Sequence, residues 1–282
     1  MPTYCNYYKI SNCIIKVVSS KSLYYTFNDN IEQFRYPYDD KVDITINHLF
    51  HKPPINSIFK YITIIDNENW TIKKSDNNIA YHYKPYDIKA ICDKTYTNWD
   101  IYIPKEFELH YNEGCMRDLA IFYSDQIILY PYLLKNNGLI LHGNTLCKDD
   151  KSILLIGKSG SGKSTLSKML ELDGWNLLCD DRTILMDNKL YGGWFYGSYN
   201  KTNNLSCSID KVCTLTKSDG SYIVNETTTL GNFYSNIVDH VDLDVSHIIK
   251  VYNSLSIGKD NNMIYNIHFN LSGDIVNIIN AL

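Results

Sequence analysis

One stretch near the middle of the chain restricts the fold more than any other. Residues 157–164 read Gly-Lys-Ser-Gly-Ser-Gly-Lys-Ser and match the pattern G-x-x-x-x-G-K-[ST] without a mismatch. The apolar run 153–156 before it is typical of a buried strand, and apolar residues at helical spacing follow it over 166–170. A strand, a glycine-rich loop and a helix in this order predict a phosphate-binding loop rather than a chance turn.

The residue types in this loop suit the binding of phosphate groups. Glycines let successive backbone N–H groups turn into one concavity at the start of a helix, where anions are favoured. We expect the Lys163 ammonium to lie between the β- and γ-phosphates of a nucleotide and the Ser164 hydroxyl to coordinate Mg²⁺. The residues predicted to bind the nucleotide are Gly157, Lys158, Ser159, Gly160, Ser161, Gly162, Lys163, Ser164 and Thr165.

Composition, net charge and cysteine pattern exclude several classes of protein for this chain. It has 282 residues, 44% hydrophobic and 21% charged, which suits one large domain or a domain with an appended module. The net charge of −4 gives no reason to expect nucleic-acid binding. The eight cysteines contain no C-x-x-C pair, and the N-terminus lacks the pattern of a signal peptide. No apolar run approaches the ~18 residues of a membrane helix. We therefore expect a cytoplasmic protein with reduced thiols and no membrane segment.

Residues 1–110 are predicted to form a β-rich N-terminal region. Short β-branched and aromatic runs follow one another with turn signals between them, which favours an antiparallel meander. The predicted strands are 13–18, 42–46, 59–65, 70–74, 79–84, 88–91 and 99–103. No catalytic constellation is evident here, and we interpret His48, His51 and His82 as structural histidines.

The remainder, 111–282, is predicted to form a P-loop domain with its core at 138–197. A helix is expected over 117–134, interrupted or ended by Pro131. Residues 139–146 and 152–156 are two apolar runs joined by four polar residues, which indicates a hairpin that feeds the phosphate loop. The helix after the loop should end at Gly174, a residue type common at C-terminal caps.

Two adjacent carboxylates follow the next apolar run. Residues 175–181 read as a strand ending in Asp180 and Asp181, and a strand ending in Asp beside a phosphate loop is where a metal-holding carboxylate sits. One carboxylate would orient Mg²⁺ and the other would accept a proton from an attacking hydroxyl. The alternative is a strand-end turn with solvated Asp residues. Arg182 would lie near phosphates or be an exposed charge.

The last third of the chain has weaker patterns. Residues 183–186 and 189–191 indicate a second hairpin, and the glycine- and aromatic-rich segment 192–197 is either an acceptor-binding loop or a plain connector. Strands are expected over 209–215, 222–224, 245–252 and 264–269, and a helix over 230–240.

The order of these motifs resembles a known family. His142-Gly143 on a hairpin, the loop 157–164, a helix ending at Gly174, and Leu-Leu-Cys-Asp180-Asp181 are similar to the catalytic domain of HPr kinase/phosphorylase. They are also similar to the related stand-alone kinases of peptide-biosynthesis clusters, including kinases of lasso-peptide precursors. Two differences from HPr kinase are evident: its second glycine-rich signature is missing after the Asp pair, and residues 1–110 do not look like its separate N-terminal domain.

The resemblance implies a fold, an activity and a set of site residues. The fold would be α/β (α+β), with an HPr-kinase/phosphoenolpyruvate-carboxykinase-like nucleotide-binding core after the β-rich N-terminal region. The activity would be an ATP- and Mg²⁺-dependent phosphorylation of serine in a peptide or small protein. The implied catalytic residues are Asp181, Asp180, His142 and Lys163, and the implied metal ligands are Ser164 and Asp180.

Three alternatives to a peptide kinase stay open at this point. The first is an HPr-type protein serine kinase/phosphorylase, which the two sequence differences disfavour. The second is a nucleotide-sensing binding protein without phosphotransfer, which the intact Asp pair disfavours. The third is a small-molecule enzyme of the carboxykinase type, for which the sequence offers no clear metal or dicarboxylate site. Homo-oligomer formation, the acceptor and the preferred nucleotide are not fixed by the sequence.

Overall fold

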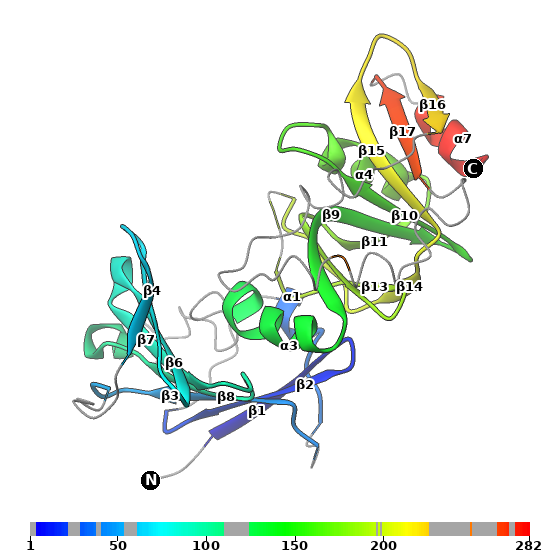
Figure 1. Cartoon of the computed structure of the whole chain (residues 1–282). Coiled ribbons are helices and arrows are strands. Elements are labelled where there is room, and N and C mark those ends of the chain that lie inside the picture. The colour runs from blue at the N-terminus through cyan, green and yellow to red at the C-terminus, as the bar shows by residue number, and fades with distance from the viewer. Residues whose placement is uncertain are drawn as a thin grey trace. The chain divides into compact units, whose positions relative to one another are not determined.

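The protein has a mixed α/β, strand-rich structure with two mixed sheets, one in each of two compact units (Figure 1). The units comprise residues 1–132 and 133–282. The computed structural model describes residues 4–21, 29–37, 41–53, 61–109, 124–195, 197, 199–225, 249, 264–270 and 274–282.

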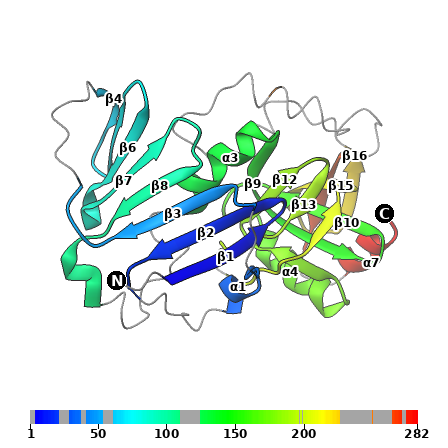
Figure 2. The ribbon, with the colours of Figure 1, turned by 90° about the horizontal axis from the view of Figure 1, so that it is seen from below.

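The N-terminal unit contains an eight-stranded sheet. Its order is β1-β2-β3-β8-β7-β6-β5-β4, and Figure 2 shows the strands from β1 to β8 side by side. The strands are β1 (Tyr4–Ile10), β2 (Cys13–Ser19), β3 (Ile44–Leu49), β4 (Ile62–Asp66), β5 (Trp70–Lys74), β6 (Asn78–Tyr83), β7 (Ile88–Asp93) and β8 (Asn98–Tyr102). The short helices are α1 (Asp29–Glu32), η1 (Lys84–Tyr86) and η2 (Lys105–Phe107).

The predicted antiparallel meander is confirmed from β4 to β8 and wrong for the pairings of β3, while β1 and β2 also pair antiparallel. Each successive pair from β4 to β8 is antiparallel, whereas β3 pairs in parallel with both β2 and β8. A parallel pair needs a crossover of about a dozen residues or more, and the chain between Ser19 and Ile44 is long enough for one. Strand β1 was not predicted from the sequence, because the polar Asn6 occupies one of its buried positions and weakens the apolar alternation.

The helical segment before the C-terminal sheet changes its winding beside a proline. A π-helix, η3 (Ser124–Leu129), is followed directly by α3 (Tyr130–Lys135), in which Pro131 is the second residue. Inside a continuous helical segment, proline donates no N–H and its ring crowds the carbonyl four residues back, so the winding changes there. The predicted interruption at Pro131 is therefore this change of winding. The first part of the predicted helix, 117–123, lies outside the described residues.

The C-terminal unit contains the second sheet, in the order β14-β13-β12-β9-β10-β15-β17-β16, with β11 also paired to β9. The strands are β9 (Gly138–Lys148), β10 (Lys151–Ile156), β11 (Asn176–Cys179), β12 (Arg182–Met186), β13 (Lys189–Tyr191), β14 (Ser206–Ser208), β15 (Lys211–Lys217), β16 (Tyr222–Asn225) and β17 (Ile264–Phe269). The helices are α4 (Lys163–Leu172) and α7 (Asp274–Asn280).

Both predicted hairpins of this unit are confirmed. Lys148 pairs with Lys151, so β9 and β10 are joined by a two-residue turn. The β12–β13 turn has positive φ at both Asp187 and Asn188, as the tightest hairpin turns require. The predicted helix 230–240 lies outside the described residues, as does the predicted strand 245–252 apart from Ile249, which is in a helical conformation.

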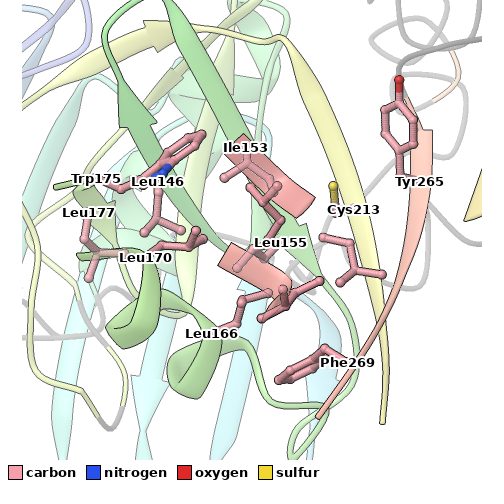
Figure 3. Close-up of a cluster of buried hydrophobic side chains, with 13 residues drawn as sticks. Leu146, Ile153, Leu155, Leu166, Leu170, Trp175, Leu177, Cys213, Tyr265 and Phe269 are labelled. Atoms are coloured by element: carbon pink, nitrogen blue, oxygen red, sulfur yellow. The ribbon is translucent and has the colours of Figure 1, made fainter. Parts of the chain in front are cut away.

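The core of this unit fixes the position of the phosphate loop. β10 lies between β9 and the parallel strand β15, which explains its nearly continuous run of buried apolar residues. Figure 3 shows Leu166 and Leu170 of α4 packed toward Leu155 of β10. The helix ends at Leu172, and Gly174 follows with φ 89° and donates its N–H to the carbonyl of Glu171, which confirms the predicted cap.

Candidate active site

The pairing of β9 with its neighbours brings the predicted site residues to one edge of the sheet. Gly143 of β9 is opposite Ile156, the last residue of β10 before the loop. On the other side of β9, His142 is opposite Arg182, the first residue of β12. β9 therefore lies between β10, which leads into the phosphate loop, and β12. The Asp pair, located between β11 and β12, approaches the loop from the other side of β9.

The phosphate loop has a backbone that only glycine adopts easily. Gly162, which caps α4, has φ 105°, and a Cβ atom there would lie 2.5 Å from the ring of Phe269. Within the loop, the Ser161 N–H donates to the carbonyl of Lys158 at 3.1 Å. The Ser161 hydroxyl is buried and has no hydrogen-bond partner within the part of the chain that the structure describes. Both features suit a loop that closes around a ligand.

The ammonium of Lys163 is turned back onto the loop. Its Nζ donates to the carbonyl of Gly157 at 2.6 Å and to that of Lys158 at 3.3 Å. Burial lowers the pKa of Lys163 from its ordinary value, while the nearby carboxylate of Asp181 opposes this shift. A phosphate anion would offer this buried ammonium a stronger partner than two neutral carbonyl groups.

Asp181 has a strained backbone that its neighbours hold in place. Its φ is 95°, a value that is unusual for a residue with a side chain. The N–H of Asp181 donates to Oδ1 of Asn144 at 3.1 Å, and its carbonyl accepts the N–H of Gly143 at 2.9 Å. Buried Asn144 also donates from Nδ2 to the hydroxyl of Ser167 on α4 at 3.0 Å. The network ties Asp181 to β9 and, through Ser167, to the helix α4 that follows the phosphate loop.

The Asp181 carboxylate lies between two basic side chains. Its Oδ2 is 3.3 Å from Nε of Arg182, and its Oδ1 is 3.6 Å from Nε2 of His142, which is too long for a direct hydrogen bond. Burial and the positive charges of Lys163 and Arg182 lower the pKa of His142, and Asp181 opposes this shift. Burial and the two neighbouring cations thus favour the uncharged imidazole of His142.

Asp180 has a different environment from its neighbour. It is buried, and its Oδ1 and Oδ2 accept the backbone N–H groups of Gly197 at 3.0 Å and Tyr199 at 2.7 Å. The side chains of Tyr199 and Lys201 continue the link by bonding Glu171 of α4. Asp180 thus anchors the loop 197–201, whose residue 198 lies outside the described residues.

Gly197 brings this loop into direct contact with Asp181. A Cβ atom at Gly197 would lie 2.7 Å from Cβ of Asp181 and 3.3 Å from Oδ2 of Asp180. Only a residue without a side chain fits there unless the carboxylates move. The predicted alternative of a plain connector therefore does not describe residue 197, which forms part of the wall of the site.

Lys163, His142 and the two adjacent carboxylates all line one cavity of about 680 Å³. Such a volume is within the range typical of small-molecule sites. The lining residues are His142, Asn144, Ser159, Gly160, Gly162, Lys163, Ser164, Thr165, Asp180, Asp181, Gly197, Lys217, Ser218, Phe269 and Asn270. Six of the nine residues predicted to bind the nucleotide line this cavity. The other three, Gly157, Lys158 and Ser161, belong to the loop but do not line the cavity.

Sequence reasoning missed the contributions of Asn144 and of the ends of β15 and β17. Asn144 did carry a signal, because a polar amide in the middle of a predicted buried strand needs a hydrogen-bond partner. No comparable signal marks Lys217, Ser218 or Asn270, since their positions depend on strands that pair far along the chain.

The comparisons with known proteins assign no family to this chain, so its function is inferred from the site residues alone. A scan against models of protein families and a search of the curated proteins both found no match to this chain. In the described part of the chain, no helix is long and apolar enough to cross a membrane.

Proposed function

We propose that this protein is an ATP- and Mg²⁺-dependent kinase that phosphorylates a serine or other hydroxyl of a peptide or small protein. The observation that carries the proposal is the placement of Asp181 and the phosphate-loop residues Lys163 and Ser164 around one cavity. A carboxylate and a phosphate loop facing one cavity are the parts that phosphoryl transfer requires. The proposal includes an HPr-kinase/phosphoenolpyruvate-carboxykinase-like core, a cytoplasmic location and, as the acceptor class, ribosomally made precursor peptides.

The phosphate loop would bind and orient the nucleotide. The free N–H groups at the start of α4 favour the phosphates, and Lys163 would exchange its carbonyl contacts for phosphate oxygens. The ammonium would then stabilise the charge on the transferring phosphoryl group. His142, beside Lys163, can donate a hydrogen bond from a ring N–H to the same group.

The residues of the cavity fit a magnesium ion. Mg²⁺ prefers oxygen ligands and usually combines one or two protein groups with phosphate oxygens and water. The Ser164 hydroxyl and the Asp180 carboxylate both line the cavity, and Oδ2 of Asp180 keeps a lone pair beyond the N–H that it accepts. When bound, the ion would neutralise charge on the β- and γ-phosphates. The predicted metal role of Asp180 is thus compatible with its role as an anchor.

Asp181 is the group that we assign as the general base. Its carboxylate is part-exposed to the cavity, and Arg182 and the Asn144–Gly143 contacts fix its position. In the proposed step the acceptor hydroxyl loses its proton to Asp181 while its oxygen bonds to the γ-phosphorus. The bond from that phosphorus to the bridging oxygen breaks, and ADP leaves with the electron pair.

Mass spectrometry of possible acceptors would test this function. We would incubate the protein with ATP, Mg²⁺ and either precursor peptides or HPr, and use Asp181→Asn as the control. A gain of one phosphate on a peptide hydroxyl, absent with the variant, is the expected result. Gain on HPr alone would instead indicate the HPr-type kinase. Binding of ATP without transfer to any acceptor would contradict the proposal and favour a nucleotide-sensing protein.

A further inference from the structure

The cavity continues past the phosphate loop to the ends of two more strands. β15 runs parallel to β10, and β17 runs parallel to β15, so all three strands end at the same edge of the sheet. Lys217 and Phe269 are the last residues of β15 and β17 and are directly opposite each other. They line the cavity together with the residues that follow them, Ser218 and Asn270. Ligands of parallel sheets commonly bind outside the carboxyl ends of the strands.

Backbone and side-chain hydrogen bonds hold this end of the cavity in one shape. The Ser218 N–H donates to the carbonyl of Phe269 at 3.1 Å. Nδ2 of Asn270 donates to the carbonyl of Asp219 at 2.7 Å, and Oδ1 accepts the Ser221 hydroxyl at 3.3 Å. The Asn270 carboxamide is therefore a fixed polar group, and the exposed Lys217 adds a positive charge beside it.

The ring of Phe269 joins this end to the phosphate loop. It is buried, and it lies where a Cβ atom of Gly162 would clash with it at 2.5 Å. The ring thus forms an apolar floor between the start of α4 and the end of β17. A planar group with polar edges would find apolar contact on this floor and hydrogen-bonding groups at its rim.

The positions of the charged groups determine which way a nucleotide would lie. Asp181 and His142 are on the β9–β12 side of the loop, and Lys217 and Asn270 are on the β15–β17 side. Transfer requires the terminal phosphate to lie beside Asp181, so the rest of the nucleotide must extend the other way. We infer that Lys217, Ser218 and Asn270 form the subsite for the nucleoside half of the triphosphate, an inference that rests on the proposed function.

Two ligands separate the contribution of the nucleoside from that of the phosphates. Calorimetric titrations with ATP and with inorganic tripolyphosphate, both in Mg²⁺, would be made on the wild type and on Asn270→Ala and Lys217→Ala. We expect the wild type to bind ATP more tightly than tripolyphosphate. Each variant should lose up to about tenfold in ATP affinity and keep its tripolyphosphate affinity within about twofold. Lys189→Ala, which removes an exposed lysine outside the cavity, is the matched control and should change neither.

The possible failures of this experiment are distinguishable. Equal wild-type affinity for the two ligands would overturn the nucleoside subsite and leave the phosphate loop intact. Equal losses for both ligands in Lys217→Ala would also overturn it, because that residue would then act on the phosphates. Asn270→Ala removes a hydrogen bond to the turn, so the exposed Lys217 provides the variant that tests the subsite without that risk. Binding of neither ligand by the wild type would overturn the proposed function and the subsite together.

Discussion

The side chain of Asn144 fixes the backbone of Asp181 through a hydrogen bond of 3.1 Å from the Asp181 N–H to the Asn144 Oδ1. Without this acceptor, the strained backbone of Asp181, with its φ of 95°, loses one of the hydrogen bonds that stabilise it. The Asp181 carboxylate should therefore shift. A misplacement of about 1 Å at a reacting group costs about 10²-fold in rate. Asn144→Ala should therefore lower kcat by about that factor and leave the dissociation constant for ATP unchanged, as single-turnover and binding measurements would show.

Ser167→Ala is the control for this effect. It removes the partner of Asn144 Nδ2 but leaves the bond between Oδ1 and Asp181 intact. We expect a decrease in kcat of only a few-fold. An equal loss in the two variants would mean that Asn144 acts through general packing and not through Asp181.

The two adjacent carboxylates should respond differently to the same substitution. Asp180→Asn replaces an oxygen that accepts the N–H of Gly197 or Tyr199 with an NH₂ group, which cannot accept it. A hydrogen bond to a charged group contributes about 1.5–3 kcal/mol, so this variant should lose about that much free energy of unfolding. Asp181→Asn should keep its stability and lose about 10²–10⁴ in phosphotransfer rate. Urea unfolding of both variants would check this, and equal stabilities would contradict the anchoring role of Asp180.

Gly197→Ala tests the contact between the loop and the general base. Its new methyl group would lie 2.7 Å from Cβ of Asp181, so the carboxylate or the loop must move. We expect at least about a tenfold decrease in kcat, measured with saturating ATP. Gly220→Ala is the matched control, since an added Cβ there meets nothing within 4 Å and should leave kcat unchanged.

The charge on Lys163 should be detectable at His142. After burial, the Lys163 ammonium is the largest cause of the lowered pKa of His142. Lys163→Met removes this charge, so the His142 pKa should rise toward its ordinary value, whereas Asp181→Asn should lower it further. NMR titration of the imidazole, assigned with His142→Gln, would measure both directions. Lys168→Met, on the exposed side of α4, should leave the pKa unchanged; a fall in Lys163→Met would contradict the arrangement.

Acid should destabilise the N-terminal unit through His48. Burial lowers the pKa of His48 from its ordinary 6.5 to about 3. Between pH 3 and pH 6.5, the unfolded chain therefore binds a proton at His48 that the folded chain does not. Stability rises with pH where the unfolded state holds more protons, so the free energy of unfolding should fall as the pH drops from 6.5 toward 3. The limiting slope for one group is about 1.4 kcal/mol per pH unit.

Urea titrations across that window, with hydrogen exchange of the β3 amides to assign the unit, would measure the slope. His48→Gln should show a smaller pH dependence. His82→Gln alters a part-exposed ring that pairs with Asp87 and should keep most of the wild-type slope. A His48→Gln slope equal to that of the wild type would show that other groups cause the acid sensitivity.

The local features were predictable from the sequence because each depends on neighbouring residues. The turn residues Asp187 and Asn188, the cap at Gly174 and the apolar run of β10 all lie within a few residues of what they determine. The parallel pairing of β3 with β2 and β8 was not predictable in the same way, because nothing local distinguishes a crossover from a hairpin.

The same reasoning explains which parts of the site the sequence indicated. The loop motif and the Asp pair are contiguous, so their chemistry can be deduced from residue type and spacing. The different environments of Asp180 and Asp181 depend on Gly197 and Tyr199, which lie in a loop beyond two further strands. The cavity wall from Lys217 to Asn270 depends on strands that are paired across a long stretch of sequence.

The hairpin between β9 and β10 makes the site sensitive to insertions and deletions, even those far from any bound molecule. The two-residue turn between Lys148 and Lys151 sets which residue of β9 lies opposite Ile156. Because side chains alternate between the faces of a strand, removing one residue of β9 between Asn144 and Lys148 would exchange the faces of His142 and Leu141. The imidazole would then enter the core and the leucine would face the phosphates. A length change in β9 should therefore be tolerated only in steps of two residues or with a compensating bulge.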